Sequence, residues 1–129
     1  MADIALILTN DWELFGEGDG DFESLQKRRL SGLLKTAEKH SAPLTVFAEV
    51  GQQFSHLHAG KSWPHLAQIA IDWELSLQDA VARGHDVQLH YHPTWRNAVF
   101  EGGRWKLDLN TWTMTDLDEI DMIPLNINT

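Results

Sequence analysis

The chain of 129 residues contains no cysteine, so disulfide bonds and thiolate metal sites are excluded. Basic residues are also scarce: 10 Lys and Arg face 19 Asp and Glu, which gives a formal net charge of -9. This acidic balance argues against nucleic acid as a partner. No apolar run approaches the roughly 20 residues that a membrane-spanning helix needs.

The length fits one domain with a single core, so residues 1–129 are expected to form one unit. The first residues, MADIALILTND, have no basic region and run into an acidic residue, unlike a secretory signal peptide. We therefore expect a cytoplasmic protein.

Strand and helix patterns alternate along the chain. Apolar or alternating runs predict strands at residues 4–9, 43–50 and 84–92, and helical periodicity predicts helices over 22–40 and 65–83. Residues 51–64 are expected to form a loop whose His56 and His58 lie on the surface. Strands that alternate with helices predict right-handed crossovers and a parallel sheet, hence an α/β fold.

The segment after the third strand has weaker patterns. A Gly-Gly pair at Gly102 and Gly103 predicts a small hairpin within residues 96–110. A short capped helix is expected from Thr115, stopped by Pro124. The last residues have no terminating signal, so the chain looks cut off rather than completed.

The third predicted strand ends in two histidines. Because alternate side chains leave a strand on opposite faces, His90 and His92 are expected to point the same way, and Pro93 then ends the strand. Two neutral imidazoles side by side form a plausible half of a metal site. The alternative is a pair of polar residues on a solvated strand face.

Carboxylates follow the other two strands. Asp11 and Glu13 come after the first strand, and Glu49 closes the second. In parallel α/β sheets functional groups gather at the carboxyl ends of the strands. The sequence therefore predicts that acidic and imidazole side chains meet on one rim of the sheet.

Four short stretches together resemble the polysaccharide deacetylase family, which shares the NodB homology domain. They are LTNDWE after the first strand, PLTVF in the second, RGHD before the third, and HYHP at its end. The resemblance covers about residues 4–95. It implies part of a distorted (β/α) barrel, a divalent metal that is often zinc, and removal of acetyl groups from N-acetylated sugars.

The resemblance also implies roles for single residues. Glu13, His90 and His92 would bind the metal, and Asp11 would act as general base, with the roles of the two acidic residues open to exchange. The histidines are spaced H-x-H, as in an L-H-x-H-P branch, instead of the common H-x-x-x-H. Trp12 and Trp95 flank the motifs and are expected to stack on a sugar; the alternative is that they pack within the rim. His85 is expected either to support the metal site or to be a residue of the turn before the third strand.

The family's later motifs supply an arginine, an acetyl pocket and a second histidine, and no match for them is found here. We therefore expect a truncated barrel that would need a second copy of the chain, as a homo-oligomer, or a missing C-terminal half. Two other hypotheses stay open: a degenerate, non-catalytic binding module, and a structural α/β domain in which these residues coincide by chance.

Overall fold

The computed structural model describes residues 5–15, 18 and 20–109. Within them, three parallel strands form one sheet in the order of the chain, β1 (Leu8–Trp12), β2 (Leu44–Glu49) and β3 (Asp86–His90). The predicted α/β class with a parallel sheet is confirmed. β1 and β3 both pair with β2 and not with each other, so the described part of the chain forms an open sheet rather than a closed barrel.

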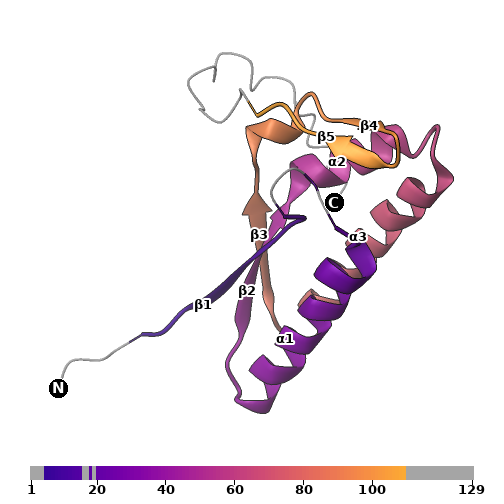
Figure 1. Ribbon diagram of the computed structural model, residues 1–129. Helices are drawn as coiled ribbons and strands as arrows, with labels where there is room; N and C mark the ends of the chain where they lie inside the picture. The colour runs from indigo at the N-terminus through magenta and orange to yellow at the C-terminus, as the bar shows by residue number, and fades with distance from the viewer. Residues whose placement is uncertain (1–4, 16–17, 19, 110–129) are drawn as a thin grey trace, which may run out of the picture.

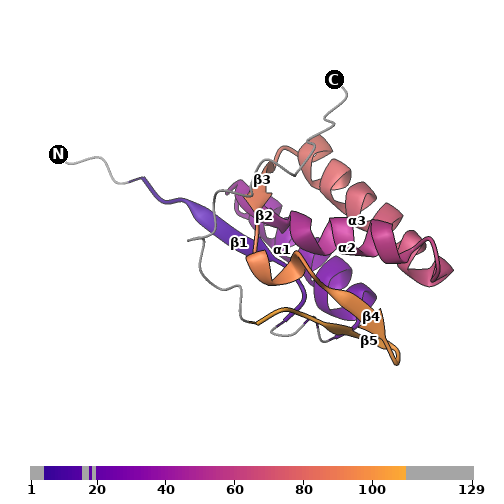
Figure 2. The same cartoon turned by 90° about the horizontal axis from the view of Figure 1, so that it is seen from above.

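Helices connect the strands on one side of the sheet. A π-helix, η1 (Phe22–Lys27), runs into α1 (Arg28–Lys39) between β1 and β2, and α2 (Val50–Ala59) and α3 (Pro64–Ala82) lie between β2 and β3. Figure 1 and the view from above in Figure 2 place α1 and α3 against the same face. The structure describes no helix on the other face, so the sheet is covered on one side.

Strand alternation separates an apolar face from a polar one. Trp12, Val46 and Ala48 are buried on the helix side, in a core that also contains Phe22, Leu30, Leu34, Leu44, Trp73 and Ala80. The register pairs Asp11 with Phe47 and Phe47 with Gln88, so these three side chains share the uncovered face. Asp11 therefore points away from the helices, whereas Trp12 points toward them.

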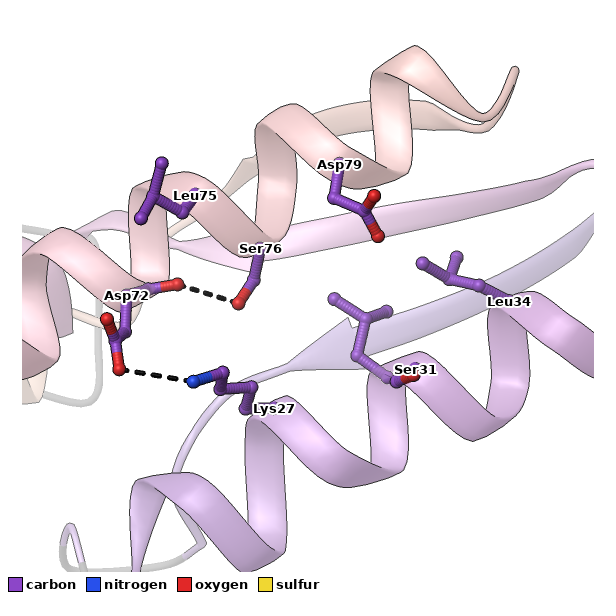
Figure 3. Close-up of a pocket in the computed structure, with 8 residues that line it drawn as sticks. Lys27, Ser31, Leu34, Asp72, Leu75, Ser76 and Asp79 are labelled. Carbon is purple, nitrogen blue, oxygen red and sulfur yellow. Dashed lines mark hydrogen bonds and ion pairs between the residues drawn. The ribbon is translucent and has the colours of Figure 1, made fainter.

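An ion pair joins the two long helical segments. The Lys27 ammonium lies 3.2 Å from the Asp72 carboxylate, and the Ser76 hydroxyl donates to the Asp72 carbonyl at 2.6 Å. Figure 3 shows these contacts in the groove between α1 and α3, which Leu34 and Leu75 also line. None of the predicted site residues lines this groove, so it belongs to the packing of the helix layer.

The first strand starts later than predicted. The apolar run predicts a strand over residues 4–9, but β1 begins at Leu8, and Leu6 and Ile7 are 82% and 75% exposed. The reason is the register: Leu8 pairs with Leu44, the first residue of β2, so the preceding residues have no neighbouring strand. Asp11 is consequently part of β1 instead of following it.

The predicted loop over residues 51–64 is wrong, because most of it is α2. This helix buries Gly51, Gln52 and His56, while His58 is exposed, so His56 is not a surface residue. A helix that buries polar residues lacks the apolar periodicity by which helices are recognised.

The second predicted helix and the predicted hairpin agree with the structure. α3 matches the helix expected over 65–83, and Gly84 takes a positive φ of 85° directly after it. The hairpin is formed by β4 (Val99–Glu101) and β5 (Arg104–Lys106), which pair antiparallel around Gly102 and Gly103. The helix expected from Thr115 lies outside the described residues.

Candidate metal centre

Four titratable side chains converge at the carboxyl end of the sheet. Glu13 follows β1, Glu49 and His90 are the last residues of β2 and β3 and are paired in register, and His92 comes two residues later. One ligand atom from each of these residues lies within 4.8 Å of the others, an arrangement that could hold a metal ion. The predicted convergence of carboxylates and imidazoles on one rim is confirmed.

Three of the ligand atoms form a small triangle. The Nε2 atoms of His90 and His92 are 2.7 Å apart, and Oε2 of Glu13 lies 3.5 Å from the first and 3.1 Å from the second. In a tetrahedral zinc site, nitrogen and oxygen ligands at about 2.0–2.1 Å from the metal stand roughly 3.3 Å from one another. The triangle thus has nearly the size of one face of such a site.

The donor types suit a borderline divalent cation. Imidazole nitrogen with carboxylate oxygen is a common ligand set for zinc, and similar sets bind other first-row metals. The two carboxylates of Glu13 and Glu49 also repel each other when both are ionised, and a cation between them offsets that repulsion. Chemistry and spacing therefore agree with a metal centre.

Glu49 occupies a special position among the four. Its side chain is fully buried, Oε1 accepts the Gly51 N–H at 2.8 Å, and Oε2 accepts the His92 N–H at 2.8 Å. Burial raises the pKa of Glu49 to about 8, despite the backbone N–H donors that lower it, and the charge of Glu13 adds to the rise. The sequence placed Glu49 on the rim but not among the site residues.

A buried glutamine pair supports the segment that carries Glu13. Gln52 of α2 accepts the Leu14 N–H at 2.9 Å through Oε1 and donates through Nε2 to Oε1 of Gln26 at 2.6 Å. Both glutamines are fully buried. No sequence motif distinguishes them from surface glutamines, so this support was not predicted.

The structure separates Asp11, which lies within β1, from Glu13, which follows it. Glu13 belongs to the group around the possible metal position, whereas Asp11 does not. Asp11 is exposed and lies within β1, two residues before Glu13. This geometry favours Glu13 as the ligand and leaves Asp11 beside the site.

The two tryptophans predicted to bind substrate are both core residues. Trp12 is 3% exposed, packs against Trp73, and donates its indole N–H to the Gln26 carbonyl at 3.1 Å. Trp95 is also 3% exposed and packs in a second cluster with Leu14, Leu66 and Trp105. Neither has a free face on which a sugar could stack, so the structure supports the alternative, rim packing.

His85 is a turn residue rather than a support of the site. Its Nδ1 accepts the Leu44 N–H at 3.1 Å, and the ring is buried. Leu44 begins β2, whereas the candidate metal ligands lie beyond the other end of that strand. His85 therefore joins the α3–β3 turn to the start of β2.

No helix in the described part of the chain is long and apolar enough to cross a membrane. Comparisons with protein-family models, curated proteins and solved structures found no match for this chain. The geometry of the candidate metal centre and the short motifs around it are the observations that bear on function.

Proposed function

We propose that this protein is a metal-dependent hydrolase that acts on the amide bond of N-acetyl groups on sugars. The observation that carries the proposal is the triangle of Glu13, His90 and His92 at the carboxyl end of the sheet. The resemblance of the surrounding motifs to polysaccharide deacetylases supports the sugar substrate. The proposal includes the architecture, in which the open sheet is part of a (β/α) barrel completed by a second copy or a C-terminal half.

The residues would divide the chemistry between binding and proton transfer. Glu13, His90 and His92 would hold the cation, which supplies Lewis acidity when bound. Asp11, exposed beside them, would accept a proton at Oδ from the water that attacks the acetyl carbon. The water oxygen bonds to that carbon, the C–N bond breaks, and Asp11 returns the proton to the leaving amine.

The first test is elemental analysis of the purified protein, first freed of metal and then incubated with zinc, next to the His90→Ala/His92→Ala double variant. We expect about one ion per chain in the wild type and none in the variant. A double variant of two exposed histidines, His40→Ala/His58→Ala, is the control and should keep its ion. Absence of metal from the wild type would overturn the proposal.

The second test measures acetate released from an N-acetylated oligosaccharide by the metal-loaded protein. Asp11→Asn should bind the ion normally and lose release of acetate by about 10²-fold or more, the usual contribution of a general base. Equal rates for Asp11→Asn and the wild type would remove Asp11 from the mechanism.

A non-catalytic metal-binding module is the second candidate. The burial of Trp12 and Trp95 favours it, because neither tryptophan can serve as a sugar platform at this site. A stoichiometric ion without any release of acetate, in the chain alone and in its oligomer, would decide for the module.

A further inference from the structure

The first turn of α2 contacts both chain segments that carry metal ligands. Glu49, the N-cap residue of α2, accepts the backbone N–H of His92. Gln52, three residues later, accepts the backbone N–H of Leu14, the neighbour of Glu13. One helical turn therefore binds the segment after β1 and the segment after β3, which lie on opposite sides of β2.

These contacts are buried, and hydrogen bonds fix the orientation of both side chains. Glu49 and Gln52 are both 0% exposed, so water does not compete for their hydrogen bonds. Each oxygen of Glu49 accepts a backbone N–H at 2.8 Å, from Gly51 and from His92. The amide of Gln52 is oriented by Gln26, because its Nε2 donates to Gln26 Oε1 while its Oε1 accepts from Leu14.

The close packing around Glu49 depends on a glycine at position 51, in the first turn of α2. A Cβ added at Gly51 would lie 2.9 Å from Oε1 of Glu49, 2.7 Å from Cβ of Trp95 and 3.1 Å from Cε2 of Tyr91. Glycine at this position therefore lets the Glu49 carboxylate and the segment around His92 approach the helix closely.

We infer that Glu49 and Gln52 are positioning residues that hold the backbone of the two ligand segments, and that Glu49 is not itself a metal ligand. The inference rests on the proposed metal centre. Glu13, His90 and His92 are then the protein ligands, and the buried turn of α2 fixes the distances among them. Groups that orient ligands in this way typically change metal affinity by 10–100-fold when they are lost.

The experiment compares cobalt(II) binding to four proteins by absorbance and by competition with a chelator. They are the wild type, Gln52→Met, Gln53→Met and Glu49→Gln. Gln53 is the matched control, because it is the next residue of the same helix and donates one hydrogen bond to a backbone carbonyl, that of Ala70 in α3. Thermal unfolding of each metal-free protein records the purely structural cost.

We expect Gln52→Met and Glu49→Gln to bind one cobalt ion with 10–100-fold lower affinity and an unchanged ligand-field spectrum. Gln53→Met should lose stability and bind cobalt within twofold of the wild type. A changed spectrum in Glu49→Gln would show that Glu49 is a ligand and would overturn the inference. Equal affinities of Gln52→Met and Gln53→Met would overturn it as well.

Amide hydrogen exchange in the metal-free proteins separates this inference from the proposed function. The N–H of His92 should lose protection selectively in Glu49→Gln, and that of Leu14 in Gln52→Met. If the wild type binds no cobalt, the proposed function fails. The exchange of these two amides still reports whether Glu49 and Gln52 hold the backbone of the two segments. Unchanged protection of both amides in both variants would by itself overturn the positioning role of Glu49 and Gln52.

Discussion

His90 and His92 bring their Nε2 atoms to within 2.7 Å of each other, although Tyr91 stands between them in the chain. The two rings meet edge to face, with centroids 4.5 Å apart. In a neutral pair one Nε2–H can donate to the lone pair of the other Nε2, and in that case neither Nε2 offers a lone pair to a cation. A cation bound through both Nε2 atoms therefore requires both rings to carry their proton on Nδ1.

Zinc should stabilise the folded protein, because the ligand triangle exists only in the folded state. At a free zinc concentration 100 times the dissociation constant, the free energy of unfolding should rise by about 2.7 kcal/mol. Thermal unfolding with zinc, and again after addition of a chelator, measures this. Glu13→Gln should lose most of the shift, whereas Glu23→Gln, an exposed control, should keep it. Equal zinc-induced shifts in the stability of both variants would contradict the assignment of Glu13 as a metal ligand.

Gly51→Ala should destabilise the protein by about 1–3 kcal/mol, the usual cost of added volume in a packed site. The new Cβ would approach Trp95 and Glu49 closer than 3.0 Å, so the segment of His92 must shift and metal affinity should fall with stability. Gly32→Ala is the control, because a Cβ added at this position of α1 would point into open space. That variant should gain about 0.5–1 kcal/mol from helix propensity. Chemical denaturation of the three proteins gives both values.

Acid should destabilise the protein through His56. Burial lowers the pKa of His56 below 6.5, although its hydrogen bond with the Gln52 carbonyl opposes the shift. Below pH 6.5 the unfolded chain binds a proton more readily than the folded protein, so stability falls as the pH decreases from about 6.5. Denaturation of the metal-free protein between pH 7.5 and 5.5 should show a steeper loss in the wild type than in His56→Gln. Parallel curves would remove His56 as the cause.

Trp12→Phe should cost about 1–3 kcal/mol, because it leaves the buried Gln26 carbonyl without its indole N–H donor. Trp63→Phe is the comparison, since Trp63 is 42% exposed and its loss should stay within about 0.5 kcal/mol. Binding of an N-acetylated oligosaccharide, measured by calorimetry, should be the same in Trp12→Phe and the wild type. Weaker binding in a stably folded Trp12→Phe would restore its role as a sugar platform.

The meeting of acidic and imidazole side chains at the carboxyl ends of the strands could be predicted from the sequence, because strand alternation and parallel topology follow simple rules. The spacing of His90 and His92 was enough to infer that both point the same way, and the structure confirms it. The same rule, applied to β1, places Trp12 on the face opposite Asp11 and Glu13, and so already opposes its role in substrate binding.

What the sequence did not reveal is the buried polar support of the site. Glu49, Gln52 and Gln26 are hydrophilic residues whose burial depends on partners far away in the chain. Hydrophobic periodicity registers apolar faces only, so α2 was mistaken for a loop and its contacts with the ligand segments had no local signal.

Because the chain has no cysteine, it has no disulfide to cross-link distant segments. The strand order would let an ion at the candidate metal centre act as such a cross-link. Glu13 follows one edge strand and His90 ends the other, with β2 between them. An ion bound by both residues would be a reversible cross-link that closes the loop of residues 13–90. By the loop-closure entropy that is used for disulfides, a link of this span would stabilise the fold by about 4.5 kcal/mol relative to the unfolded chain.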